Sequence, residues 1–210
     1  MDRTRLTRAA CFAAGAPVVG VGVSVLLRSG TGVAPFDVTN SGVAAVTGWD
    51  VGTASWVVSV VLLAAAVIAG RRPRPGTVVA TLAIGAVVNL ALAHLEPAQG
   101  PPAQLGYALA GMSLMWVGIV ALVCADFGAG PAEELMLALV ARSWPLREVR
   151  WGIEAALAAV GWLMGGALGV STLVFVVCTG PVLAWAIPRS AQVLRLSPHL
   201  PGPGVPAELR

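Results

Sequence analysis

The chain has 210 residues, of which 57% are hydrophobic and only 11% are charged, and its formal net charge is +3. Soluble domains carry about 25% charged residues, so this composition excludes an ordinary soluble protein and indicates a membrane protein. All 13 basic residues are arginines, too few and too scattered for a nucleic-acid-binding surface, which excludes nucleic acid as the main partner.

Six apolar, uncharged runs are long enough to cross a bilayer, whose hydrocarbon core about 30 Å thick needs roughly 20 helical residues. They cover residues 9–27, 53–70, 77–95, 104–125, 151–169 and 171–187. The sequence therefore predicts an all-α membrane protein with six transmembrane helices, which crosses the cytoplasmic membrane several times and has the lipid bilayer as its first partner.

The arginines predict the orientation, because basic residues in short loops are retained on the cytoplasmic side. With the N-terminus inside, twelve arginines fall inside and only Arg28 falls outside. Both termini are therefore predicted to be cytoplasmic and the loop 96–103 external. The densest basic cluster, residues 71–74, falls inside. A role in fixing the topology is enough to explain this cluster. The alternative is that it binds anionic lipid headgroups.

An internal repeat relates the two halves of the chain. Residues 31–37 align with residues 127–133 at an offset of 96, which matches Gly32 with Gly128 and Asp37 with Glu133. Each half contains one span, a Gly-Pro-acid segment and two more spans. Three crossings is an odd number, so the second half is predicted to be inverted relative to the first, as in many secondary transporters.

This repeat divides the chain into four predicted parts. They are a first three-span repeat at 1–95, an external loop at 96–103, a second three-span repeat at 104–190 and a disordered cytoplasmic tail at 191–210, which is rich in proline and glycine.

The two Gly-Pro-acid segments are predicted to form short helices that start at Pro35 and Pro131, with an acid in the first turn near the positive end of the helix dipole. Two interpretations stay open. The helices lie at the interface and the acids only complement the dipole, or they re-enter the membrane and bring Asp37 and Glu133 towards its midplane. Glu134, about 100° further around the helix, is expected to face the headgroups.

The candidate substrate or proton path consists of Asp37, Asn40, Asn89 and Glu133. Asn89 lies about midway along the third predicted span, where a polar side chain needs a partner, and an interhelical hydrogen bond is the alternative to lining a path. A further pair, Arg150 and Glu154, has the spacing of an ion pair on one helix, or of a gate at the inner mouth.

Three glycines in the fifth predicted span recur every fourth residue, at Gly161, Gly165 and Gly169. On a helix they would form one smooth stripe that allows close packing, within the monomer or in a homo-oligomer.

These segments together resemble the YczE/YyaS/YitT group of bacterial integral membrane proteins, most closely its YczE-like members. The resemblance spans nearly the whole chain and rests on Gly32-Val-Ala-Pro-Phe-Asp-Val38, Gly52-Thr53, Pro75-Gly-Thr77, Asp126-Phe-Gly-Ala-Gly-Pro131, Val149-Arg-Trp-Gly-Ile-Glu154, Gly161-Trp-Leu-Met-Gly-Gly166 and Thr179-Gly-Pro181. It implies the multi-pass architecture. The group has no assigned activity, so the resemblance implies none.

The sequence contains no nucleophile with a partnered base, no metal-ligand cluster and no phosphate-binding Gly-Lys-Ser/Thr loop, and its three cysteines form no CxxC pair. We therefore expect no enzyme, no cofactor and no metal.

The leading hypothesis is a small secondary permease for a small solute or ion. The alternative is a membrane accessory or assembly factor that acts through membrane protein partners. A permease needs a polar cavity that adjoins residues such as Asp37, Asn89 or Glu133, whereas an accessory protein can be packed solid.

Overall fold

The computed structural model describes residues 3–194 and 196, and within these it contains eight α-helices and no strand. The helices are α1 (Arg3–Ser29), α2 (Pro35–Thr47), α3 (Val51–Ile68), α4 (Pro75–His94), α5 (Pro101–Ala125), α6 (Pro131–Val140), α7 (Leu146–Leu163) and α8 (Val170–Leu194). The all-α class is confirmed for this part of the chain.

Proline and glycine set many of the helix boundaries. Proline occupies the first turn of α2, α4, α5 and α6, where its missing N–H removes no helical hydrogen bond and its fixed φ suits the helix. Gly48 caps the end of α2 with a left-handed φ of 75°, a conformation that glycine adopts without steric cost.

Five helices are long and apolar enough to cross a membrane, namely α1, α3, α4, α5 and α8. The expected sixth span, 151–169, is not confirmed. Its helix, α7, begins earlier, at Leu146, and ends at Leu163. Those 18 residues include four charged ones, Arg147, Glu148, Arg150 and Glu154, because the helix begins in the charged segment that precedes the expected span.

Two other boundaries differ from the expectation. The predicted external loop 96–103 is shorter at its end, because α5 already begins at Pro101. Helix α8 continues to Leu194 and so includes the first residues of the predicted tail. Apart from Leu196, the rest of that predicted disordered tail lies outside the described residues.

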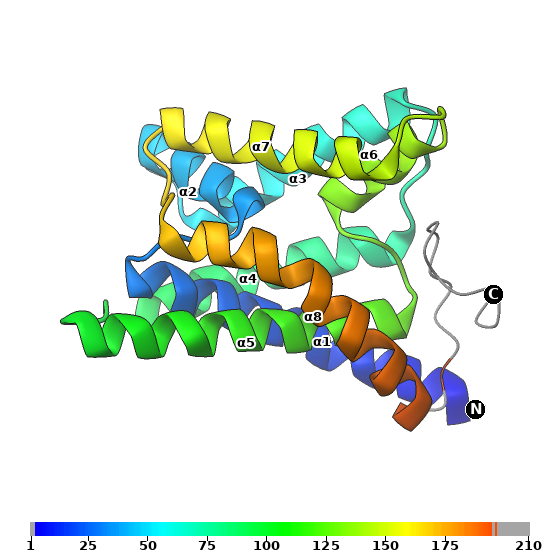
Figure 1. Cartoon of the computed structure of the whole chain (residues 1–210), viewed down its shortest axis with the longest axis horizontal. Helices are drawn as coiled ribbons and strands as arrows, with labels where there is room; N and C mark the ends of the chain where they lie inside the picture. Colours follow the sequence, from blue (N-terminus) through cyan, green and yellow to red (C-terminus); the bar gives the residue numbers. More distant parts are fainter. Residues whose placement is uncertain (1–2, 195, 197–210) are drawn as a thin grey trace.

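The helices form two layers (Figure 1), with α1, α4, α5 and α8 in one and α2, α3, α6 and α7 in the other. Each short helix packs on the third helix of the other half of the chain, α2 on α7 and α6 on α3. The outer surface is apolar: Val60 of α3 is 66% exposed and Leu173 of α8 is 68% exposed. Such a surface fits a bilayer as solvent and not water.

Glycines bring α1 and α5 into close contact over much of their length. Gly15 lies against Gly118, and Gly22 lies against Gly111. As the residue number on α1 rises, the number of the contacted residue on α5 falls, so the two helices are antiparallel. Small residues at these positions let the two backbones approach closely, which is how helices associate without a hydrophobic driving force between them.

We expect Gly111→Ala to destabilise the protein by about 1–3 kcal/mol, the usual cost of adding a methyl group to a filled interface. A Cβ at this position would lie 2.7 Å from the backbone nitrogen of Leu26, which cannot move aside as a flexible side chain would. Thermal unfolding in one detergent measures the effect.

Gly106→Ala on the same helix is the matched control, because a Cβ there meets nothing within 4 Å. Alanine is favoured over glycine by about 1 kcal/mol inside a helix, so this variant should be at least as stable as the native chain. Equal stability of the two variants would contradict the tight α1–α5 contact.

Both short helices begin inside the protein. Along the α2–α7 contact, Thr39 donates a hydrogen bond to the Leu157 carbonyl (2.6 Å), and Gly42 lies against Gly161. The residue numbers on α2 and on α7 rise together along this contact, so the two helices run in the same direction. The segment that follows α7 lies near the end of α1, because the Val33 N–H bonds the Ala167 carbonyl and the Ser171 N–H bonds the Thr31 carbonyl. The chain must therefore turn inward after α1 before α2 starts.

Helix α6 has the same relation to α3 at the opposite end of the long helices, as Figure 1 shows. Just beyond the end of α6, the Arg142 side chain donates a hydrogen bond to the carbonyl of Ile68, the last residue of α3. The first turns of both short helices thus place acidic residues in the interior.

Candidate functional site

The first turn of α2 holds a buried polar pair. Asp37 is 6% exposed and Asn40 is fully buried, and the Asn40 Nδ2 donates a hydrogen bond to the Asp37 Oδ1 at 3.1 Å. The Asn40 Oδ1 is buried and has no hydrogen-bond partner among the described residues. Leaving a buried acceptor unpaired costs free energy, so this atom marks a point where a cation or a hydrogen-bond donor could bind.

Burial raises the pKa of Asp37 to about 7, and the hydrogen bond from Asn40 only partly offsets that rise. Desolvation disfavours the charged form of a carboxyl group, which is the direction seen here. Asp37 lies in α2, outside the five helices long enough to span a membrane.

In the second half, the acid in the interior is Glu134 and not Glu133. Glu134 is 1% exposed, and its carboxylate accepts hydrogen bonds from the Arg71 Nε, the Thr77 hydroxyl and the Ala129 N–H. Glu133 is exposed. The expectation that Glu134 faces the headgroups is wrong.

The reason is the face that α6 packs on α3. Its buried residues are Glu134 and Ala138, which lie one turn apart on the same side of the helix. Glu133 lies on another side. The alignment of Asp37 with Glu133 holds in sequence but not in burial. The small residue Ala138, four positions after Glu134, could have indicated from the sequence that this face of α6 is buried. The pairing of Glu134 with Arg71 was not predicted.

Asn89 joins α4 to the start of α3. Its side-chain oxygen accepts a hydrogen bond from the Gly52 N–H (2.7 Å), and its amide nitrogen donates one to the Thr53 hydroxyl (3.2 Å). The side chain thus satisfies one of the backbone N–H groups that a helix leaves unpaired at its start. Asn89 thus forms the interhelical hydrogen bond that the sequence analysis gave as the alternative to lining a substrate path.

The predicted pair on α7 is present, with the Arg150 Nε 3.0 Å from the Glu154 Oε1. Both side chains are partly exposed, and they lie one turn apart on a single helix. Local ion pairing of this kind stabilises the helix modestly. A gating role for this pair stays a prediction.

Further ion pairs at the same end join segments far apart in sequence. Asp126, at the end of α5, pairs with Arg8 of α1 (3.2 Å) and with Arg74 in the α3–α4 loop (3.1 Å). Together with the pair formed by Arg71 and Glu134, these contacts tie α1, α5, α6 and the α3–α4 loop together.

The three glycines do not form one helical stripe, because α7 ends at Leu163. Gly161 lies in α7 against the backbone of Val38, and Gly169 lies in the following loop against Thr31. Gly165 adopts a left-handed φ of 84° just after the helix. The expectation of a single stripe is wrong, because it assumed a helix running to residue 169.

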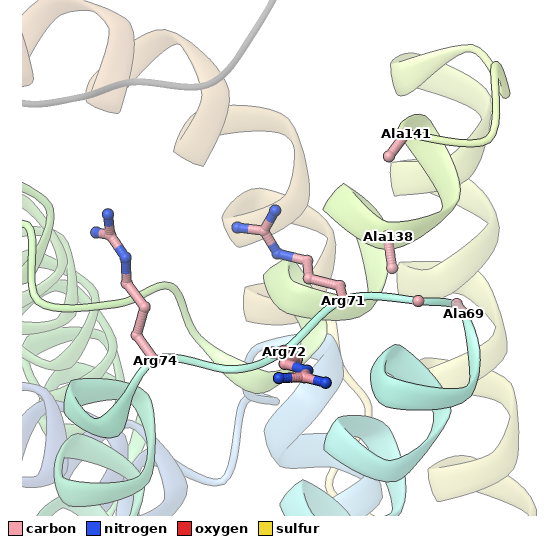
Figure 2. Close-up of a pocket in the computed structure, with 7 residues that line it drawn as sticks. Ala69, Arg71, Arg72, Arg74, Ala138 and Ala141 are labelled. Carbon is pink, nitrogen blue, oxygen red and sulfur yellow. The ribbon is translucent and has the colours of Figure 1, made fainter.

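A cavity of about 450 Å³ lies between the α3–α4 loop and α6 (Figure 2). Three arginines and four small residues line it, and Asp37, Asn40, Asn89 and Glu133 are not among them. The cavity instead adjoins Arg71, the partner of Glu134. Within the described residues, no three His, Cys, Asp or Glu side chains are grouped so as to hold a metal ion.

Comparison with known proteins places the chain among proteins without an assigned activity. The family described as "Family of unknown function (DUF6198)" matches residues 6–188. The uncharacterized membrane protein YczE of Bacillus subtilis is 26% identical over 200 residues, which cover 92% of each chain. An uncharacterized protein of Haemophilus influenzae is 25% identical over 185 residues, 88% of this chain and 83% of that protein. No solved structure matches. The predicted resemblance to YczE-like proteins is confirmed.

Proposed function

This chain belongs to DUF6198, a family of unknown function, and we propose that it is a small secondary permease that moves a small solute or ion across the cytoplasmic membrane. The observation that carries the proposal is the pair of buried acids, Asp37 and Glu134, each in the first turn of a short helix that begins inside the protein. Ionisable residues buried at depth in a membrane protein usually mark a transport path.

We further propose that the chain is an inverted repeat with a two-fold axis near the α1–α5 contact. The glycine contacts support this. Adding 96 to Gly15 and Gly22 gives Gly111 and Gly118, so an exchange of the two halves turns the Gly15–Gly118 contact into the Gly22–Gly111 contact. The exchange also turns the α2–α7 contact into the α6–α3 contact.

A second pair of contacts supports the same symmetry. Gly32 lies against Thr172, and Gly128 lies against Thr77. The glycines differ by 96 positions and the threonines by 95. Independent packing of two unrelated halves would give no reason for such paired contacts.

In this proposal α2 and α6 are re-entrant helices that enter from opposite faces. The N-terminus of a short helix carries a partial positive charge, which the Asp37 carboxylate in the first turn of α2 offsets. Transporters of this plan place the ends of broken helices at the substrate site. The unpaired Asn40 oxygen and the Asp37 carboxylate are both acceptors. The site therefore suits a cation or a solute with hydrogen-bond donors.

Flux into proteoliposomes tests the proposal. The purified chain is reconstituted and assayed against a panel of inorganic cations, amines and small neutral polar solutes, with and without a proton gradient. We expect uptake above protein-free vesicles for one class of solute. Correctly folded protein without flux for any member of the panel would reject transport.

The alternative is an accessory factor that acts through membrane protein partners. One observation favours it: the 450 Å³ cavity is lined by none of the residues Asp37, Asn40 and Asn89. A permease needs a path to Asp37, whereas an accessory protein needs no such path. The flux assay separates the two functions.

The proposal also takes α7 as the sixth crossing, beside the five apolar helices, because an even number of crossings leaves both termini in the cytoplasm. Alkaline phosphatase, which is active only outside the cytoplasm, should be active when fused at Gln99 and inactive when fused at Arg72 or after Leu194. The reason is the twelve-to-one distribution of arginine in the sequence. The reverse activity pattern would contradict this orientation.

A further inference from the structure

The cavity between the α3–α4 loop and α6 has an unusual charge. Its lining includes Arg71, Arg72 and Arg74 but no acidic side chain. Two of these arginines are partly neutralised from outside the lining, since the Arg71 Nε bonds Glu134 and the Arg74 Nη1 bonds Asp126. Arg72 forms no ion pair within the described residues.

The remaining donor groups are numerous. Arginine has five N–H donors in a planar fork. Arg71 bonds Glu134 through its Nε, and Arg74 bonds Asp126 through its Nη1. Figure 2 shows Arg71 and Arg74 extending to the same side of the loop, whereas the Arg72 side chain extends in another direction. Ala138 and Ala141 of α6 line the cavity with small side chains, which leaves room for a tetrahedral anion.

We propose that this cavity binds a phosphate-bearing anion through the guanidinium groups of Arg71 and Arg74, with Arg72 adding positive charge to the lining. Arginine pairs with phosphate through parallel N–H bonds, which makes it the preferred residue for such groups. The loop lies on the side of the membrane that the arginine distribution predicts to be cytoplasmic, where basic pockets between helices bind lipid headgroups. The phosphate comes either from an anionic lipid or from a water-soluble phosphate compound.

The site is separate from the Asp37 site but shares Arg71 with Glu134. An anion in the cavity competes with the Glu134 carboxylate for this guanidinium. Neutralising Glu134 should therefore strengthen anion binding, whereas losing Arg72 should weaken it. The opposite signs distinguish a defined site from general attraction to a basic surface.

Binding is measured on the full chain in a neutral detergent, which removes the surface potential of a membrane. The probes are short-chain phosphatidylglycerol, its zwitterionic phosphatidylcholine counterpart, glycerol 1-phosphate and inorganic phosphate. We expect the native chain to bind an anionic probe at least ten-fold more tightly than phosphatidylcholine. R72Q should weaken this binding about ten-fold, and E134Q should strengthen it several-fold.

R5Q is the matched control, because it removes the same charge from an exposed residue of α1 on the same predicted face. It should change binding by less than three-fold. Binding of phosphatidylglycerol alone assigns the site to a lipid, and binding of glycerol 1-phosphate or phosphate assigns it to a soluble anion. Equal losses in R72Q and R5Q, or no preference for the anionic probes, would overturn the proposal.

Discussion

Asp37→Asn should reduce solute flux roughly 10- to 100-fold, because a hydrogen bond to a charged group contributes roughly 1.5–3 kcal/mol. The amide keeps the size of the side chain and its place near Asn40. It cannot take up or release a proton, and it cannot neutralise a bound cation. Initial rates of uptake into proteoliposomes measure the effect.

The stability of the same variant separates a transport role from a structural one. Burial raises the pKa of Asp37 from 3.8 in the unfolded chain to about 7 in the folded protein. The folded protein therefore binds this proton more tightly, and the acid costs stability increasingly as the pH rises from about 4 to 7. Asp37→Asn removes that cost, so it should unfold at an equal or higher temperature than the native chain at pH 8.

Glu133→Gln is the matched control for flux, because Glu133 has the same sequence position in the other half but is exposed. It should retain native flux. Full activity of Asp37→Asn, or equal losses in both variants, would remove Asp37 from the transport path.

Arg71→Met should destabilise the protein by about 2 kcal/mol. Removing one partner of a fully buried ion pair costs about 3–5 kcal/mol, and the cost falls when water screens one of the charges. Glu134 is 1% exposed while Arg71 is 35% exposed. The variant would leave the Glu134 carboxylate with only the Thr77 hydroxyl and the Ala129 N–H.

A double-mutant cycle isolates the interaction of Arg71 with Glu134. Arg71→Met combined with Glu134→Leu should recover most of the lost stability, because no buried charge then remains unpaired. Arg72→Met is the control for a change in net charge and should lie within about 0.5 kcal/mol of the native chain. Thermal unfolding of all variants in one detergent gives the values. Additive losses would show that the two residues do not interact.

The sequence was most informative where one physical rule dominates. Uncharged apolar runs predicted the five helices that can span a membrane, because a bilayer demands both length and the absence of charge. The ends of α3, α4 and α5 agree to within three residues, and those of α1 and α8 to within seven. Proline predicted where α2 and α6 begin. The approximate extent of these helices follows from local chemistry alone.

Prediction failed where tertiary contacts decide. The charged start of α7 is helical, and Arg150 pairs there with Glu154 one turn further along. A hydropathy window detects neither feature. Of the adjacent Glu133 and Glu134, only Glu134 is buried, because it lies on the face of α6 that packs on α3. An offset of 96 in the alignment gives the equivalent position but not the direction of the side chain.

Helix α2 of the first half packs on α7 of the second half, so this contact can form only after α7 has been synthesised. The hydrogen bond from Thr39 to Leu157 spans 118 residues, and ribosomes add about 5–20 residues per second. The face of α2 that packs on α7 is therefore without its partner for roughly 6–24 s after it is made. For that time the nascent first half must be sheltered by lipid or by the insertion machinery, because its own partner helix does not yet exist.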